Sequence, residues 1–220
     1  CVHLRLKENG QQSLKQSKTS KKFVYLISPN KIEDESFYAN LALVLSTKKI
    51  SFFQLRLKKE TSLNKLMIGK KIKKICKKYK VKFLINDDPL LAKKLNADGC
   101  HLGQKDMDLI KARKILKDKI IGVTCHNSIN LAKIAIKAGA DYLAFGAFFT
   151  SKTKIIKYRA SLRILNSVKK ITLLPIVAIG GIKLNNYKKL LLNKANFLAI
   201  SGYIWNNKKY KPLEAIKKLK

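Results

Sequence analysis

The chain has 220 residues, 46% of them hydrophobic, and a net charge of +35 from 48 basic and 13 acidic residues, which suits one domain with a sizeable core. No apolar run approaches the roughly 20 residues of a membrane span, and no signal-peptide core follows the N-terminus, which argues against membrane and secreted classes. The four cysteines form no CxxC pair, which argues against a disulfide framework and predicts reduced thiols in a cytoplasmic protein.

The first 22 residues are polar, basic and without any period. A segment of that composition cannot bury enough apolar surface to fold. We expect residues 1–22 to be a disordered basic arm, or an artefact of where the gene was taken to start, and residues 23–220 to form the folded domain. The chain begins with Cys1 and not with Met, which leaves open whether this arm belongs to the mature protein.

From Phe23 onward, short apolar runs rich in Ile, Val, Phe and Leu alternate with segments of helical period. Eight runs are strand candidates: 23–28, 51–57, 82–86, 98–102, 119–124, 141–146, 175–179 and 197–201. Runs that are apolar on both faces are typical of parallel strands buried on both sides. Because eight parallel strands close a barrel, we predict an α/β chain folded as a single (β/α)8 TIM barrel.

An open doubly wound sheet is the alternative fold. Such a sheet would normally carry a glycine-rich loop after its first strand. Here the first strand ends in Ser28-Pro29-Asn30, with no GxGxxG pattern. The barrel is therefore the favoured interpretation.

Local signals indicate where individual helices begin, end and bury a face. Two apolar faces are expected, comprising Ile68, Ile72, Ile75, Cys76 and Tyr79, and Leu131, Ile134, Ala135 and Ala138. Asp88 followed by Pro89 predicts an N-cap and first helical position, and Asn127 or Ser128 caps a later helix. Gly139 lies where a helix C-terminus favours a left-handed residue.

Polar side chains follow the second strand, and in a barrel of this kind the active site lies at the carboxyl ends of the strands. The alternation of a strand places Gln54, Arg56 and Lys58 on one face, with Leu55 and Leu57 on the other. An ordinary amphipathic strand with a wet face is the simpler explanation. In a buried parallel strand, however, a row of cations is costly unless it meets an anion, so we favour an anion site.

The third and fourth strands end in carboxylates. Asn86 and Asp87 follow the third strand, and Asp106 follows the fourth. Asp88 already has a role as the N-cap, which leaves Asp87 for another task, whereas capping of the next helix competes with metal binding at Asp106. Two carboxylates at neighbouring strand ends suit Mg²⁺, which takes one or two protein carboxylates and completes its shell with phosphate and water.

The fifth strand ends at Thr124, whose hydroxyl could bond either a phosphate or a ring nitrogen. His101 and His126 are interpreted as hydrogen-bonded structural histidines, because neither has an obvious partner for catalysis. The chain therefore offers no catalytic dyad at this point.

The last three strands end in small, hydroxyl-bearing or basic residues. After the sixth strand come Ser151, Thr153 and Lys154, which suit phosphate oxygens. Gly181 follows the seventh strand. Ser201 and Gly202 follow the eighth, where barrels often bind phosphate through backbone N–H groups. The residues thus predict two anion sites, one assisted by metal near strands two to four and one without metal near strands six to eight.

These motifs together resemble the thiamine-phosphate synthase family, over residues from about 23 to 204. Six motifs in one order carry the resemblance: QLRLK at 54–58, IND at 85–87, GCHLGQKD at 99–106, GVTCH at 122–126, GAFFTSKTK at 146–154 and AIGGI at 178–182. The resemblance implies a (β/α)8 barrel that joins hydroxymethylpyrimidine diphosphate to hydroxyethylthiazole phosphate, releasing pyrophosphate by a dissociative mechanism.

The resemblance also implies a role for each motif residue. Mg²⁺ would be the cofactor, bound by Asp87 and Asp106. The pyrimidine diphosphate would be held by Gln54, Arg56, Lys58 and Asn86, and Lys154 would reach the diphosphate as well. Thr124 stands where the family usually has Ser and would keep a substrate-binding hydroxyl. The catalytic stabilisation of the leaving group would come from Arg56, Lys58 and Lys154. The thiazole phosphate would be held by Ser151, Thr153, Gly181, Ser201 and Gly202.

The chain departs from the family pattern at a few positions. Thr150 replaces a common proline, which leaves that loop less rigid, and Asp88 replaces a frequent Arg, which adds negative charge beside the metal site. Gly202 stands where Ser is frequent, leaving only backbone donors. None of these changes removes a metal ligand or a diphosphate cation.

Two other functions compete with the synthase. A related thiazole tautomerase shares the barrel but would be expected to lack the diphosphate and metal residues, which are present here. A non-catalytic nucleic-acid-binding barrel would follow from the charge, yet lysine supplies almost all of it without aromatic interleaving or a known motif. We therefore expect small phosphorylated substrates, no membrane and no specific nucleic acid; the oligomeric state, a homo-oligomer included, is left open.

Overall fold

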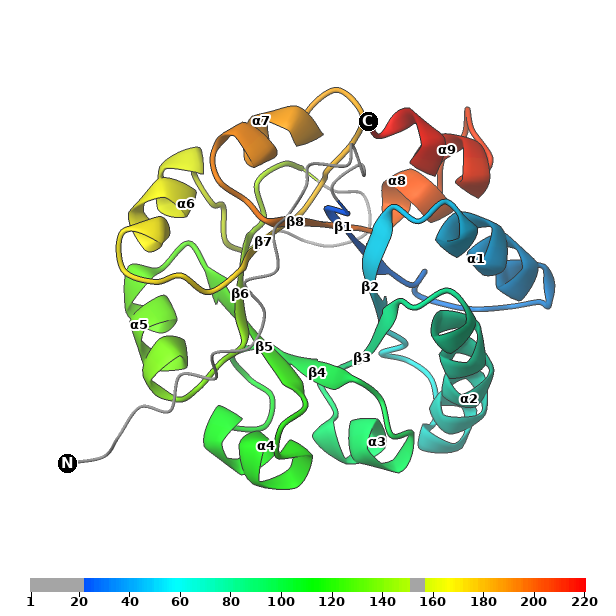
Figure 1. Cartoon of the computed structure of the whole chain (residues 1–220), viewed down its shortest axis with the longest axis horizontal. Coiled ribbons are helices and arrows are strands. Elements are labelled where there is room, and N and C mark those ends of the chain that lie inside the picture. The colour runs from blue at the N-terminus through cyan, green and yellow to red at the C-terminus, as the bar shows by residue number, and fades with distance from the viewer. Residues whose placement is uncertain (1–21, 151–156) are drawn as a thin grey trace, which may run out of the picture.

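The computed structural model describes residues 22–150 and 157–220, and in them eight parallel strands form a closed barrel, with helices arranged around it (Figure 1). Each strand pairs with its neighbours in chain order, and β8 pairs with β1 to close the sheet. The strands are β1 (Val24–Ile27), β2 (Ile50–Leu55), β3 (Lys82–Asn86), β4 (Gly99–Leu102), β5 (Ile120–His126), β6 (Tyr142–Gly146), β7 (Ile176–Ile179) and β8 (Phe197–Ile200). The predicted fold class is confirmed.

The helices lie on the outside of the barrel, and most connect one strand to the next (Figure 1). They are α1 (Ser36–Ser46), α2 (Ser62–Lys78), α3 (Pro89–Lys94), α4 (Leu109–Leu116), α5 (Ile129–Lys137), α6 (Leu162–Lys169), α7 (Tyr187–Leu192), α8 (Gly202–Trp205) and α9 (Pro212–Lys218). No helix of the described part of the chain is long and apolar enough to span a membrane. The predicted arm, apart from Lys22, and the predicted site residues Ser151, Thr153 and Lys154 lie outside the described residues.

Two apolar layers stabilise the barrel. The larger cluster lies between the strands and the helices, and the smaller one fills the barrel interior. In the interior, the rings of Tyr25, Phe52, Tyr142 and Phe197 pack against one another, with centroid distances of 5.0 to 6.2 Å. Such a filled interior leaves the chemistry to the rim, where the strands end.

The predicted helix boundaries are confirmed at several positions. Asp88 caps α3 by accepting the N–H of Leu91, and Ser128, not Asn127, caps α5. Gly139 has a φ of +85° just after α5, as expected for a left-handed residue at a helix end. One prediction was wrong: Ile134 is 64% exposed, because α5 buries the side of the helix that carries Ala132 and Ala135 instead.

An Asp or Asn residue directly before β4, β6 and β8 hydrogen-bonds the start of the preceding strand. The side chains of Asp98, Asp141 and Asn196 accept the backbone N–H of Phe83, Ile121 and Ile176, at 2.7 to 2.9 Å. Each of the three also donates its own backbone N–H to the carbonyl of the same partner. These paired bonds fix the register at the amino ends of the strands.

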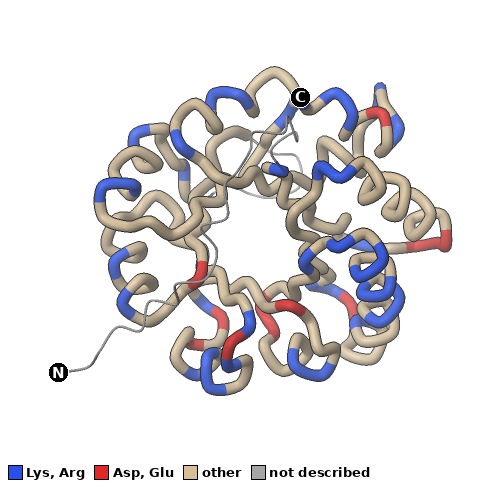
Figure 2. Tube along the Cα trace, in the orientation of Figure 1, with Lys and Arg blue, Asp and Glu red and all other residues tan. Residues whose placement is uncertain are grey.

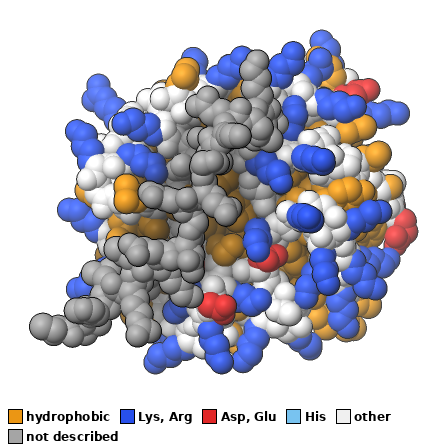
Figure 3. All heavy atoms as spheres, in the orientation of Figure 1, with side chains coloured by type: hydrophobic (Ala, Val, Ile, Leu, Met, Phe, Trp, Pro, Cys, Tyr) orange, Lys and Arg blue, Asp and Glu red, His pale blue; other side chains and the backbone are white. Residues whose placement is uncertain are grey.

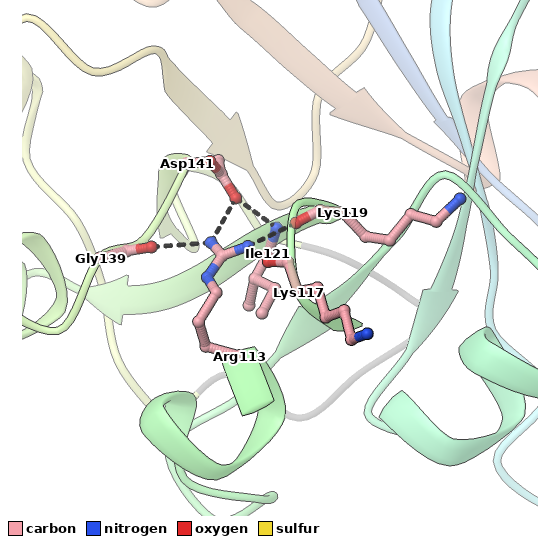
Figure 4. Close-up of polar contacts among 6 residues, drawn as sticks. All are labelled: Arg113, Lys117, Lys119, Ile121, Gly139 and Asp141. Atoms are coloured by element: carbon pink, nitrogen blue, oxygen red, sulfur yellow. Dashed lines mark hydrogen bonds and ion pairs between the residues drawn. The ribbon is translucent and has the colours of Figure 1, made fainter. Parts of the chain in front are cut away.

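Arg113 of α4 forms further hydrogen bonds around one of these residues, Asp141 (Figure 4). Its guanidinium donates to the Asp141 carboxylate at 2.7 Å and to the carbonyls of Lys117, Lys119 and Gly139 at 2.6 to 2.8 Å. One planar fork thus joins the loops before β5 and β6. These contacts lie at the amino ends of the strands and stabilise the barrel without contributing to the rim.

Candidate active site at the carboxyl rim

Gln54 is the last residue of the predicted row that still lies within a strand. β2 ends at Leu55, two residues earlier than predicted, so Arg56 and Lys58 lie in the loop that follows it. The alternation is as predicted, since Leu55 and Leu57 are each 3% exposed among the helices. Gln54 is 2% exposed. Its side-chain amide is not one of the fully buried polar atoms without a partner in residues 22–150 and 157–220, where the Tyr203 hydroxyl alone is in that state.

Arg56 is held at the rim by the end of β1. Its backbone N–H donates to the Ser28 hydroxyl at 2.9 Å, and its guanidinium donates to the Asn30 side chain at 3.0 Å. Burial lowers the pKa of Arg56, and the nearby Asp87 carboxylate opposes that shift. The result is a partly buried guanidinium directed toward the acidic part of the rim.

Asp87 and Asp106 come together as the sequence predicted. Their carboxyl groups lie close enough for each to shift the pKa of the other, and Lys58 forms an ion pair with Asp87 at 2.8 Å. Neighbouring strands deliver the two acids to one point, because the N–H of Asp87 extends the β3–β4 ladder by donating to the carbonyl of His101 at 2.8 Å. Asp87 has a φ of +65°, a left-handed conformation that Asp and Asn tolerate better than most residues.

The two carboxyl groups differ in their acidity. Burial acts to raise the pKa of Asp87, but the hydrogen bonds from Asp106 and Lys58 outweigh it, so the pKa is lowered. Burial and the Asp87 carboxyl together raise the pKa of Asp106, although the N–H of Gly103 donates to it at 2.7 Å. Two acids this close need either a shared proton or a cation between them.

The structure also separates metal binding from helix capping. The N-cap of α4 is Asp108, whose carboxylate accepts the N–H groups of Ile110 and Lys111. Asp106 is therefore not needed as a cap and remains in the rim beside Asp87. The described residues contain no group of three or more His, Cys, Asp or Glu side chains that could hold a metal. A pair of carboxylates fits Mg²⁺ with a phosphorylated substrate, since phosphate and water complete its shell.

A cavity of about 240 Å³ opens beside Asp87, and Lys58 and Asn86 also contribute to its wall. Gln54, Arg56 and Asp106 do not line it. Lys65 of α2 lines it as well, although sequence alone does not distinguish this lysine from the many others. The structure thus places a further cation near the predicted diphosphate residues.

Thr124 bonds a ring nitrogen, one of the two partners that the sequence left open. Its hydroxyl lies 2.8 Å from Nε2 of His101, and Gln104 donates its side-chain amide to the Thr124 carbonyl. His101 is hydrogen-bonded, as expected for a structural histidine. Gln104 was not among the predicted residues, although it lies in the motif that contains Asp106.

Gly180 and Gly181 allow the loops after β6 and β7 to pack closely. Their φ angles are +106° and +60°, and a Cβ on Gly181 would lie 2.2 Å from the Thr150 carbonyl oxygen. A Cβ on Gly180 would lie 2.4 Å from that of Ala147. Any other residue would separate the two loops, so this glycine pair places Gly181 directly against the segment that leads into Ser151.

Ser201 and Gly202 lie at the end of β8, beside the end of β1. The Ser201 hydroxyl donates to the Ser28 carbonyl at 3.0 Å, and Trp205 donates its indole N–H to the Ile27 carbonyl at 2.7 Å. The hydroxyl hydrogen of Ser201 is therefore committed to the protein. An anion at this strand end would therefore be contacted by the backbone N–H groups at the start of α8.

Sequence reasoning missed the residues at the end of β1. Ser28 is 2% exposed and contacts both Arg56 and Ser201, and Asn30 contacts the Arg56 guanidinium. The only available signal was their position directly after the first strand, where rim residues are expected.

Comparisons with known proteins identify the family of the chain. The family model described as thiamine monophosphate synthase matches residues 24–204. The thiamine-phosphate synthase of Pelagibacter ubique is 86% identical over 207 residues, which cover 94% of this chain and 100% of that protein. The thiamine-phosphate synthase of Nitrosomonas eutropha is 40% identical over 184 residues, which cover 83% of this chain and 86% of that protein.

Among solved structures, thiamine phosphate pyrophosphorylase from Pyrococcus furiosus is similar, with a TM-score of 0.77 and 27% sequence identity. The match covers 90% of this chain and 94% of that one. The sequence resemblance is thereby confirmed, and the relatives named above are synthases and not tautomerases. The chain belongs to the thiamine monophosphate synthase family, and its activity is that of a thiamine-phosphate synthase.

Proposed function

We propose that the chain is a Mg²⁺-dependent transferase that joins 4-amino-5-hydroxymethyl-2-methylpyrimidine diphosphate to 4-methyl-5-hydroxyethylthiazole phosphate. The observation that supports the metal requirement is the proximity of the Asp87 and Asp106 carboxyl groups, with Lys58 at 2.8 Å from Asp87. This arrangement brings two oxygen-ligand side chains and a cation to one point of the rim. The arrangement suits a metal bound together with a diphosphate.

The diphosphate is held by cations and amides around this point. Arg56 and Lys58 bind its oxygens and stabilise the negative charge that grows on pyrophosphate as the C–O bond breaks. Gln54 and Asn86 orient the pyrimidine diphosphate through their amides, and Thr124 contributes its hydroxyl. When bound by Asp87 and Asp106, Mg²⁺ would supply further positive charge at the departing pyrophosphate.

No protein nucleophile is required for this reaction. The aminopyrimidine ring delocalises the positive charge left on its methylene carbon, and the thiazole nitrogen then forms the new C–N bond there. The protein contributes by holding the two substrates in line, an effect worth up to about 7–11 kcal/mol in the best intramolecular reactions. Accordingly, the rim needs well-placed cations and amides and no catalytic dyad.

The thiazole phosphate is held at the opposite side of the rim, by Gly181, Gly202 and Ser201 together with Ser151 and Thr153. The positive φ of Gly181 and the close packing of its loop support a preformed backbone surface there. Because the Ser201 hydroxyl donates to Ser28, we assign the anion contact at that strand end to backbone N–H groups. Lys154 completes the binding of the diphosphate.

The three cysteines of the described residues are buried free thiols, which supports a reducing compartment, and we place the enzyme in the cytoplasm.

The decisive experiment mixes the purified chain with both phosphorylated substrates and follows thiamine phosphate by chromatography. We expect product with Mg²⁺ and none after chelation with EDTA, with activity restored by added Mg²⁺. Product that is unaffected by chelation would contradict the metal requirement alone. No product under any condition would contradict the synthase reaction itself.

A matched pair of substitutions then tests the metal ligands. Asp106→Asn removes one carboxylate from the rim, whereas Asp108→Asn makes the same chemical change two residues away at a helix cap, where Asn serves as well as Asp. We expect Asp106→Asn to weaken Mg²⁺ activation by at least about tenfold and Asp108→Asn to leave it unchanged. Equal Mg²⁺ dependence in both variants would remove Asp106 from the metal site.

A further inference from the structure

A chain of hydrogen bonds runs from the barrel interior to the active site. The hydroxyl of Tyr25 lies 2.8 Å from that of Tyr142, which lies 2.8 Å from Nδ1 of His101. Nε2 of His101 in turn lies 2.8 Å from the Thr124 hydroxyl. Tyr25 and Tyr142 are 2% and 3% exposed. The mechanism proposed above uses only the last member of this chain.

The barrel makes room for this chain with a glycine. Gly122 of β5 pairs with His101 of β4 on one side and with Tyr142 of β6 on the other. A Cβ on Gly122 would lie 1.8 Å from the Tyr142 ring, so no other residue fits without a shift. Because the middle strand has no side chain at this level, the rings of His101 and Tyr142 stack at 5.6 Å between centroids.

The donors and acceptors fix the direction of the chain. Within the described residues, the Tyr25 hydroxyl has Tyr142 as its hydrogen-bond partner and no other. If Tyr25 donates to Tyr142, then Tyr142 donates to Nδ1, and the ring carries its hydrogen on Nε2 and donates it to Thr124. Every buried hydrogen then has an acceptor.

The opposite tautomer leaves one hydrogen without an acceptor. If Thr124 donates to Nε2, the ring donates from Nδ1 to Tyr142, Tyr142 donates to Tyr25, and the Tyr25 hydrogen meets no acceptor among the described residues. Burial raises the pKa of Tyr25 and of Tyr142, so both phenols keep their hydrogens. An unsatisfied buried donor is unfavourable, so the first arrangement prevails.

We propose that Tyr25, Tyr142 and His101 are positioning residues that keep the Thr124 hydroxyl a hydrogen-bond donor toward the bound substrate. An ionised phosphate oxygen accepts hydrogen bonds and does not donate them. A Thr124 hydroxyl that had donated its hydrogen to His101 would present a lone pair to such an oxygen. Since Nε2–H already donates to the Thr124 oxygen, the Thr124 hydrogen is directed to the substrate. This inference rests on the proposed role of Thr124 in binding the diphosphate substrate.

The tautomer of His101 is the direct test and needs no substrate. The chain has three histidines, so ¹⁵N-histidine labelling with His3→Gln and His126→Gln variants identifies the His101 ring signals. We expect an unprotonated Nδ1 and a protonated Nε2, and we expect Tyr142→Phe to abolish this fixed preference. An Nδ1–H tautomer, or an unchanged tautomer in Tyr142→Phe, would overturn the proposal.

Kinetics tests the consequence for the substrate. Thr124→Val should lower kcat/KM by about tenfold to a hundredfold, the effect of one hydrogen bond to a charged group, and Thr124→Ser should restore most of it. Tyr142→Phe should lower kcat/KM in the parent chain but cause little further loss in the Thr124→Val background, because it acts through Thr124. The same loss in both backgrounds would overturn the proposal.

A buried phenol elsewhere provides the control. Tyr187 is 1% exposed, and its hydroxyl donates to the Lys220 carbonyl at 2.7 Å, away from the hydrogen-bond chain. Tyr187→Phe should leave both the His101 tautomer and kcat/KM unchanged, and a matching loss there would reduce the Tyr142 effect to general destabilisation. If the parent chain makes no thiamine phosphate, the proposed function fails while the tautomer measurement still stands.

Discussion

Asp87 at the rim combines a rare backbone conformation with charged neighbours. Asp87 has a φ of +65°, forms an ion pair with Lys58 and lies beside the Asp106 carboxyl group. Left-handed backbone at a residue other than glycine is unfavourable by about 1–2 kcal/mol, less for Asp and Asn, and such residues cluster at functional sites. The side chain at this position can therefore be changed to Asn without disturbing the backbone.

We predict that Asp87→Asn loses turnover by at least about a hundredfold and keeps the fold. Asn tolerates the same backbone, and the partly exposed ion pair to Lys58 contributes no more than about 1 kcal/mol to the free energy of unfolding. Steady-state assays with saturating Mg²⁺ and urea unfolding measure the two effects. Asp108→Asn is the control, since Asn caps α4 as well as Asp does. Unfolding of Asp87→Asn, or full turnover by it, would contradict the assignment.

Pairs of strands are fastened by a recurring short motif. Ala-Asp-Gly, Ala-Asp-Tyr and Ala-Asn-Phe begin at residues 97, 140 and 195, directly before or at the start of β4, β6 and β8. In each, the alanine is buried and the next side chain accepts a backbone N–H of the preceding strand. The repeat is visible in the sequence, but its meaning follows only from the pairing of neighbouring strands.

The motif predicts that two substitutions at Asn196 differ in their effect on the free energy of unfolding. Asn196→Ala leaves the Ile176 N–H without its acceptor and should lower the free energy of unfolding by about 1–3 kcal/mol. Asn196→Asp keeps an acceptor of the same shape, as at positions 98 and 141, and should retain most of the stability. Urea denaturation with an unchanged m-value measures both. Equal losses would show that the N–H is satisfied by some other group.

The whole molecule is a barrel with a strongly basic outer surface. Lys and Arg are spread around the outer helices, whereas the strands carry few charges (Figure 2), and basic side chains surround the face shown in Figure 3. The described residues contain five ion pairs, against a formal net charge of +35. Most of the positive charge is therefore opposed only by solvent ions. Such a surface attracts anionic substrates and repels itself.

Salt should affect stability and catalysis in opposite directions. Raising ionic strength from about 0.01 M to about 0.1 M shortens the screening length from about 30 Å to about 10 Å. We expect Tm to rise because self-repulsion weakens, and kcat/KM for the phosphorylated substrates to fall because attraction weakens. Calorimetry and initial rates at fixed Mg²⁺ measure these changes. A falling Tm, or kcat/KM insensitive to salt, would contradict this view of the surface.

The sequence by itself determined the order of strands and helices, the cap at Asp88, a cap at Asn127 or Ser128, and the motif residues of the rim. These features depend on residues close together in the chain, where the periods of strand and helix and the geometry of a cap are set locally. The carboxylates at 87 and 106 could be predicted to meet because parallel strands end at the same edge.

Only the tertiary structure decided which groups touch across the barrel. In the structure, Asp108 caps α4 and Ile134 is exposed. Thr124 is hydrogen-bonded to His101, which is hydrogen-bonded to Tyr142 across Gly122. These contacts depend on the register of strands that are distant in sequence and on closure of β8 against β1. A local pattern contains no information on either, because register is fixed by packing of the whole interior.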